Sequence, residues 1–179
     1  QFWLRSVSRS YLHAWQLDSQ HQIRKGIEKH EFWKLEMFTY SLVQLCYLGL
    51  IFTFFGWLGL ISAVLAGVIS FSLLELINYI EHYGMARKIK ANGQYERVGL
   101  QHSWNSDNQL GRIVLYELTR HSDHHYRASK KYQLLESHEK SHDLPFGYPS
   151  CMLMALIPPL WFSIMNPRVP GKTQAQLAY

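Results

Sequence analysis

Cysteine is scarce in this sequence, and the placement of the two cysteines excludes several classes of protein. Cys46 and Cys151 lie far apart, each inside an apolar run, and the sequence contains no Cys-x-x-Cys motif. A disulfide-rich secreted domain and a cysteine-based structural zinc site are therefore excluded. We expect both thiols to be buried and unreactive, in a reducing or membrane setting. The sequence also lacks zinc-finger spacing and an aromatic-basic groove pattern, so we do not expect nucleic acid as a partner.

Charge is almost absent from one long stretch. Between Met37 and Asn78, a run of 42 residues, Glu75 is the only charged side chain. The run is roughly twice the length that a helix needs to cross a bilayer. We interpret it as two antiparallel membrane helices, 36–54 and 58–83, because a buried hairpin of a soluble protein seldom stays apolar for so long. The break falls at 55–59, where two glycines flank Trp57.

The basic residues lie at the edges of the apolar runs. The sequence has 18 basic and 13 acidic residues, a net charge of +5. This excess is compatible with a solvated basic face, but its position favours the anionic cytoplasmic surface of a membrane. The basic residues before the first helix are Arg24, Lys25, Lys29 and Lys34, and those after the second are Arg87, Lys88 and Lys90. The positive-inside rule places both ends in the cytoplasm and the uncharged turn on the other side.

These patterns predict an all-α fold, an integral membrane helical bundle with a cytoplasmic, histidine-rich helical cap. We treat 1–179 as a single domain with four parts: an amphipathic cytoplasmic segment (1–35), a transmembrane hairpin (36–83), a cytoplasmic histidine-box region (84–149), and a C-terminal docking segment and tail (150–179). The spacing of Ile113, Val114, Leu118 and His121 predicts a helix over 111–126. The apolar stretch 151–165 is short and is interrupted at Pro158-Pro159, which favours a re-entrant or docking segment.

Three histidines within five residues carry the first chemical signal. On a helix, His121, His124 and His125 stand at i, i+3 and i+4, so their imidazoles share one face. A solvated polar patch is the alternative, but this geometry lets one short helix offer three nitrogen ligands to a metal. Imidazole binds iron, zinc, copper and nickel. The absence of cysteine ligands favours an iron site that activates oxygen over a structural zinc site.

His82 is the second signal. It ends a polar stripe with Glu75 and Asn78 on the second apolar helix, and such a stripe must face a protein interior or a water-filled cavity. Alone, His82 would be interpreted as an interfacial anchor, but with the other three histidines it predicts a shared metal site. Glu81 and Asp123 neighbour the expected ligands and suit carboxylates that orient imidazoles. We assign the same orienting role to Glu75 and Asn78 of the stripe. His102 has two open interpretations, a residue that holds a ligand from behind or a structural residue, and we do not assign it as a ligand. We expect His13, His21, His30, His138 and His142 at the surface.

Four strings of residues resemble a known family. They are NYIEHYG (Asn78–Gly84), GQYERV (Gly93–Val98), HSWNS (His102–Ser106) and LTRHSDHH (Leu118–His125). The chain is similar in these strings to the membrane-bound alkane 1-monooxygenases, the non-haem di-iron alkane hydroxylases of bacteria. The similarity continues through Gly147-Tyr148, Ala155–Phe162 and Asn166–Val169.

The resemblance implies a bundle of six transmembrane helices in the bacterial inner membrane, with two irons on its cytoplasmic side. It implies terminal hydroxylation of medium- or long-chain n-alkanes with dioxygen, and electrons from rubredoxin and rubredoxin reductase. His82, His121, His124 and His125 correspond to four iron ligands. The family's earlier HxxxH and HxxxHH boxes are absent from the sequence. We therefore expect it to be the C-terminal part of such an enzyme, inactive by itself.

Other functions remain open. The same superfamily includes desaturases and xylene or fatty-acyl hydroxylases, and a non-catalytic membrane metal-binding protein is an alternative from another class. The basic residues that flank the expected ligands also have two interpretations, contact with anionic lipid or docking of an acidic electron carrier. They are Arg87, Lys88, Lys90, Arg97, Arg127, Lys130 and Lys131.

Overall fold

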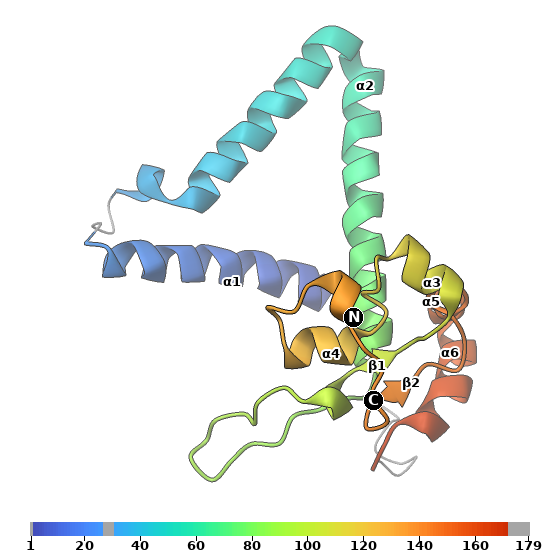
Figure 1. Cartoon of the computed structure of the whole chain (residues 1–179). Helices are drawn as coiled ribbons and strands as arrows, with labels where there is room; N and C mark the ends of the chain where they lie inside the picture. Colours follow the sequence, from blue (N-terminus) through green and yellow to red (C-terminus); the bar gives the residue numbers. More distant parts are fainter. Residues whose placement is uncertain (1, 27–30, 172–179) are drawn as a thin grey trace. The chain divides into compact units, whose positions relative to one another are not determined.

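The structure, a computed structural model, describes residues 2–26 and 31–171. Lys29, His30 and the end of the tail lie outside the described residues. The chain forms two compact units, Gln1–Glu75 and Leu76–Tyr179. One long helix, α2 (Glu36–His82), begins in the first unit and ends in the second. Figure 1 shows the elements along the chain.

The first unit is helical over most of its described part. It contains α1 (Phe2–Arg24), the short 3-10 helix η1 (Phe32–Lys34) and most of α2. The Asp18 carboxylate accepts a hydrogen bond of 2.8 Å from the Met37 N–H, so α1 supplies an anionic cap to the first turn of α2. At the other end of α1, the Trp3 ring stacks on Phe71 at 5.6 Å. The segment 1–35, for which an amphipathic and cytoplasmic character stays a prediction, thus contains the long helix α1.

The predicted break in the apolar run lies at Gly56. Its backbone has φ 62° and ψ −159°, which is non-helical and favours glycine, and it divides α2 into two arms. The arms, 36–55 and 57–82, are about 30 Å and 39 Å long at 1.5 Å per residue. Figure 1 shows the chain reversing at this point. Each arm is long enough to cross the apolar part of a bilayer.

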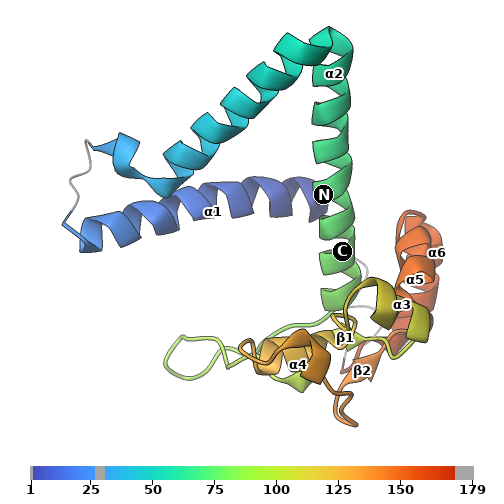
Figure 2. The same cartoon turned by 45° about the horizontal axis from the view of Figure 1, so that its top comes forward.

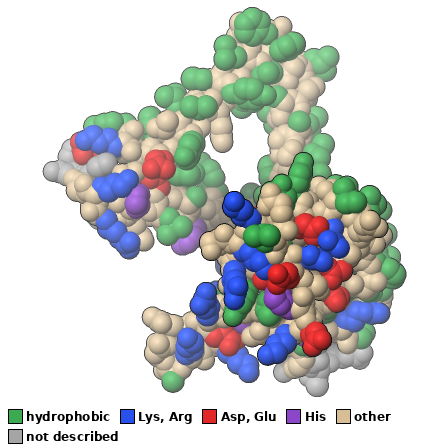
Figure 3. Space-filling model, in the orientation of Figure 1, with side chains coloured by type: hydrophobic (Ala, Val, Ile, Leu, Met, Phe, Trp, Pro, Cys, Tyr) green, Lys and Arg blue, Asp and Glu red, His purple; other side chains and the backbone are tan. Residues whose placement is uncertain are grey.

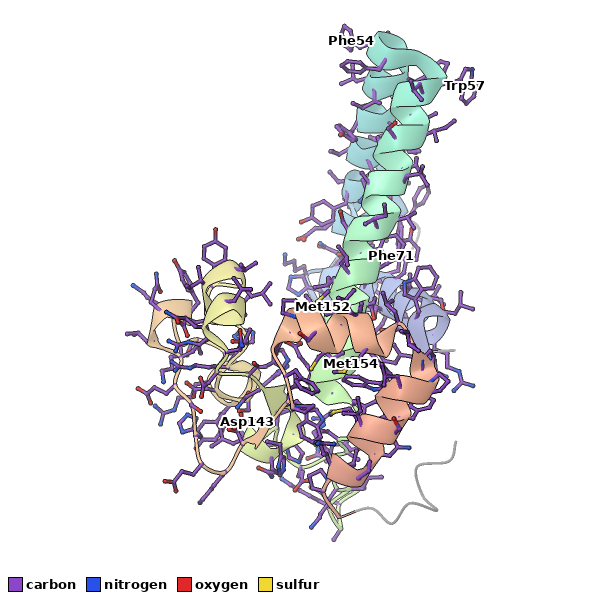
Figure 4. All side chains as sticks on the ribbon, turned by 90° about the vertical axis from the view of Figure 1, so that its right-hand side faces the viewer. Phe54, Trp57, Phe71, Asp143, Met152 and Met154 are labelled. Carbon is purple, nitrogen blue, oxygen red and sulfur yellow. The ribbon has the colours of Figure 1, made fainter. Side chains whose placement is uncertain are left out.

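The surface of α2 is apolar and uncovered. Its most apolar window has a mean hydropathy of 2.3, and none of that window is buried. Phe54 and Trp57 point outward at the tip (Figure 4), and Figure 3 shows hydrophobic side chains along both arms. Cys46 is exposed on α2, so its predicted burial is wrong, whereas Cys151 is buried. An apolar surface of this length is typical of a helix that lies in a membrane, and the chain is mostly helical as predicted.

The second unit packs short elements against the last two turns of α2. These are η2 (Leu100–His102), β1 (Trp104–Asn105), α3 (Gln109–Val114), α4 (His121–Tyr126), η3 (Tyr132–Leu134), β2 (His142–Asp143), α5 (Tyr148–Ala155), α6 (Pro158–Met165) and η4 (Asn166–Arg168). Helices α5 and α6 lie side by side (Figure 2) and separate before Pro158, as the sequence predicts. Their buried faces meet α2 in one core, formed by Ile80, Trp104, Leu144, Tyr148, Cys151, Trp161, Met165 and Val169.

Two features differ from the prediction. The strands β1 and β2 form a parallel pair of two residues each, which an all-α prediction does not contain. The predicted helix 111–126 is wrong, because α3 ends at Val114 and α4 begins only at His121. Tyr116 and Glu117 between them have φ of 51° and 62°. An ion pair of 2.8 Å from Arg112 to Glu117 holds this left-handed turn, and helical periodicity does not reveal such a contact.

Candidate metal centre

Three of the predicted histidines converge at the end of α2. His82, His121 and His125 each offer a ring nitrogen, and these nitrogens lie within 4.8 Å of one another. The Nε2 atoms of His82 and His121 are 3.2 Å apart, and the ring centroids of His121 and His125 are 4.3 Å apart. His82 comes from the last turn of α2 and the other two from α4. The predicted sharing of one site by the two motifs therefore has a matching geometry.

Hydrogen bonds fix which nitrogen of two rings carries the proton. His82 Nδ1 lies 3.3 Å from the main-chain carbonyl of His102, and a carbonyl oxygen can only accept. His121 Nδ1 lies 3.2 Å from Glu81 Oε1, which also accepts a bond of 2.8 Å from the Tyr148 hydroxyl. These partners favour the tautomer in which both imidazoles donate through Nδ1, and in that tautomer both Nε2 atoms keep a free lone pair.

Two lone pairs that face each other at this distance repel unless a cation lies between them. A metal ion at the usual metal–imidazole length of about 2.1 Å from both nitrogens would subtend an angle of about 100° between them. This lies between the ideal octahedral and tetrahedral angles, so the pair fits a metal without movement. Glu81 and the His102 carbonyl orient the imidazoles from behind, which is the usual arrangement around a metal ligand.

The charge state of the rings also suits a metal. Burial, followed by the neighbouring imidazoles of His125, His82 and His124, lowers the pKa of His121 to about 2. Burial, followed by His82 and His124, lowers the pKa of His125 as well. Both rings are therefore neutral near pH 7, and a neutral imidazole is the form that binds metals.

His124 stands at the edge of this group. Its ring centroid lies 6.0 Å from that of His121 and 5.7 Å from that of His125. The i, i+3 and i+4 spacing places it on the face of α4 that carries the other two. It is thus a neighbour of the three-nitrogen group, outside the set whose nitrogens lie within 4.8 Å of one another.

The four predicted orienting residues differ in their surroundings. Glu81 is 3% exposed and contacts His121, where an orienting carboxylate is needed. Asn78 is partly buried on α2, one turn before His82. Glu75 belongs to the first unit, and its Oε2 is buried without a hydrogen-bond partner among the described residues.

Asp123 is buried but is bonded away from the histidines. It pairs with Lys130 at 2.8 Å, accepts the Glu136 N–H at 2.9 Å, and lies 3.0 Å from His138 Nε2. Burial acts against the ionised form, but Lys130, the Glu136 N–H and His138 together lower the pKa of Asp123 below its usual value. Asp123 therefore ties the segment after α4 to that helix. His138, expected at the surface, is held by this carboxylate.

The segment 102–106 positions both histidine-bearing elements. Trp104 Nε1 donates to the Tyr83 carbonyl at 2.8 Å, which anchors the end of α2. Asn105 accepts the Ser122 N–H at 2.8 Å and donates to the Ser122 hydroxyl at 2.7 Å, which anchors the start of α4. In the sequence, the string HSWNS indicates only the resemblance, and its positioning role was not predicted. The feature of the sequence that points to this positioning role is a run of hydrogen-bonding side chains between the two histidine motifs.

A cavity of about 330 Å³ adjoins the histidines. His82, His102 and His125 line it together with Met85, Ala86, Arg87 and Val98. Its wall is thus apolar beside the ring nitrogens and carries one guanidinium.

Comparison with known proteins gives the family. The model of the Fatty acid desaturase family matches residues 1–151 of the sequence. The chain belongs to this family. This desaturase-family chain is 41% identical to Alkane 1-monooxygenase 2 of Pseudomonas aeruginosa over 165 residues, 92% of the chain and 43% of that protein. It is 38% identical to Alkane 1-monooxygenase 2 of Alcanivorax borkumensis over 175 residues, 97% of the chain and 45% of that protein.

A relative of lower identity bears a different name. The Xylene/toluene monooxygenase hydroxylase component XylM of Pseudomonas putida is 30% identical over 137 residues, 74% of the chain and 35% of that protein. The desaturase-family chain thus spans less than half the length of these three relatives. The similarity to alkane 1-monooxygenases predicted from the histidine motifs is confirmed.

Proposed function

We propose that this chain is part of a membrane-bound oxygenase that hydroxylates the terminal methyl group of medium- or long-chain n-alkanes. The observation that carries the proposal is the convergence of the His82, His121 and His125 ring nitrogens within 4.8 Å of one another, in a chain similar to alkane 1-monooxygenases. The site holds two irons, with dioxygen as co-substrate and rubredoxin, reduced by its reductase, as electron donor.

The histidines divide the work of holding metal. His82, His121 and His125 would hold one iron, and His124 would contribute to holding the second, for which this chain supplies only part of the ligands. Bound iron supplies the redox chemistry that activates dioxygen. Glu81 and the His102 carbonyl hold the Nδ1 protons, so each Nε2 stays directed at the metal.

The apolar surface of α2 supports a membrane location. In our proposal both arms cross the bacterial inner membrane, and the metal centre lies at the cytoplasmic end of the second arm. Alkanes dissolve in the bilayer, so the substrate reaches the site without passing through water. The apolar part of the cavity beside His82 and His125 would take the chain end and keep water away from it.

The test uses the protein made from its whole coding sequence in bacterial membranes, with rubredoxin, rubredoxin reductase and NAD(P)H. Octane, hexadecane, xylene and a fatty acid are supplied in turn, and products and bound iron are measured. We expect 1-alkanols from the alkanes. Desaturated acid or hydroxylated xylene as the main product would instead identify one of the related activities.

Two matched variants link the activity to the site. His121→Ala should lose both bound iron and product, whereas His13→Ala, an exposed histidine of α1, should keep both. Normal iron content in the His121→Ala protein would refute the ligand assignment. Product formation at normal rates in that variant would refute the function.

A further inference from the structure

His102 lies beside the candidate metal centre, and its position suggests two different roles. It lines the same cavity as His82 and His125, as a further metal ligand would. It is also 8% exposed and is the first residue of the segment 102–106, which anchors α2 and α4, as expected of a structural residue. The hydrogen bonds of its ring decide between these roles.

Both ring nitrogens of His102 are already used. Nδ1 accepts a hydrogen bond of 2.8 Å from the Gly99 N–H, which uses its lone pair. Nε2 lies 3.0 Å from Glu96 Oε1. The Lys88 N–H, with a smaller contribution from His102, holds the pKa of Glu96 below its usual value, so Glu96 is an ionised acceptor and Nε2 carries the proton. Neither nitrogen of His102 is left to bind a metal.

The part of His102 that contacts the candidate metal centre is its main-chain carbonyl. This oxygen receives the Nδ1 proton of His82 at 3.3 Å. The imidazole fixes the carbonyl by holding the turn 99–102 at Gly99 on one side and at Glu96 on the other. Two residues later, Trp104 binds the Tyr83 carbonyl, so one strip of chain holds both the ring of His82 and the backbone beside it.

We infer that His102 is a positioning residue for His82 that acts through its main-chain carbonyl, and that Glu96 holds it in place from outside the metal centre. The inference rests on the proposed metal centre and adds to it two residues that do not touch metal. Because the side chain acts only by fixing the turn, a side chain that accepts from Gly99 can replace the imidazole. A metal ligand cannot be replaced in this way.

The test is a titration with Co²⁺ of the purified protein, made from its whole coding sequence and stripped of metal. Affinity, stoichiometry, the visible spectrum of bound Co²⁺ and the thermal midpoint are recorded for each variant. His102→Ala should weaken Co²⁺ binding roughly 10- to 100-fold and alter the spectrum, without lowering the number of ions bound. His102→Asn places Oδ1 near the Nδ1 position, accepts from Gly99, and should recover most of the affinity. Glu96→Gln should have a smaller effect than His102→Ala.

The ligand variants His82→Ala and His121→Ala serve as the reference. A loss of bound ions in His102→Asn equal to that in His82→Ala would show that His102 is a ligand and overturn the inference. Wild-type affinity and spectrum in His102→Ala, with only a lower thermal midpoint, would show a merely structural role and also overturn it. If His102→Ala does not fold, His102→Asn and Glu96→Gln decide between the same outcomes. Unchanged binding in His121→Ala would refute the metal centre itself, and the positioning role with it.

Discussion

Gly84 is a position at which a single added methyl group should be costly for two separate reasons. It follows the candidate ligand His82 by two residues, and its φ of 73° is left-handed. A Cβ at this position would lie 2.5 Å and 2.7 Å from the two Cγ atoms of Val169, which is buried. Gly84→Ala therefore adds a conformational cost of about 1–2 kcal/mol and an overpacking cost of about 1–3 kcal/mol. We expect a total loss of roughly 2–5 kcal/mol in the free energy of unfolding.

The two costs separate in a double-mutant cycle. Thermal unfolding in detergent, followed by tryptophan fluorescence, should show a fall of roughly 4–20 °C for Gly84→Ala. Val169→Ala removes the clashing methyl groups, so the double variant should be more stable than the sum of the single changes predicts, by about 1–3 kcal/mol. Gly93→Ala is the matched control, because Gly93 has φ 76° but its Cβ would meet nothing within 4 Å. A coupling energy near zero, or equal losses at Gly84 and Gly93, would refute the reasoning.

Three further changes test other parts of the structure. Asn105→Ala leaves the buried Ser122 N–H unpaired, so it should lower the stability by about 1–3 kcal/mol and reduce bound metal; a variant with normal metal content would show that this clamp does not position α4. In a protein without the native cysteines, Leu58→Cys, beside the break between the two arms of α2, should react with an impermeant thiol reagent outside intact cells. A cysteine introduced among the basic residues before α2 should not react. The reverse labelling pattern would overturn the proposed orientation. The double variant Arg127→Gln, Lys131→Gln changes two exposed cations and should raise the apparent KM for rubredoxin, and added salt should have the same effect. An unchanged KM at low salt would show that these residues do not bind the carrier, and contact with anionic lipid would be their remaining role.

The structure also narrows the basic surface that the sequence suggests for an electron carrier. Lys130 is 16% exposed and is bonded to Asp123 at 2.8 Å. It therefore holds the segment after α4 and is omitted from the docking test. Arg87 lies over the Tyr95 ring at 5.1 Å, which leaves its charge at the surface. A count of charges along the sequence cannot separate a buried ion pair from an exposed cation.

Features that depend on composition and spacing over a few residues could be predicted from the amino-acid sequence. The uncharged run predicts α2, the glycines beside Trp57 predict its break, and Pro158 predicts the separation of α5 from α6, because length, hydropathy and backbone preference act over a few residues. The i, i+3 and i+4 spacing on α4 likewise predicts a shared face for its histidines. The strings NYIEHYG and RHSDHH together predicted the similarity to alkane 1-monooxygenases.

The hydrogen bonds that orient the histidines become visible only in the tertiary structure. Tyr148 reaches Glu81 across 67 residues and the His102 carbonyl reaches His82 across 20, so no local period contains these bonds. They set the protonated nitrogen of each imidazole, which makes the Nε2 atoms available to a metal. Asp123 shows that proximity in sequence can also mislead. Its place beside the histidines predicted an orienting role, but its carboxylate contacts Lys130, the Glu136 N–H and His138. Side-chain hydrogen bonds depend on which elements pack together, and packing is a property of the whole fold.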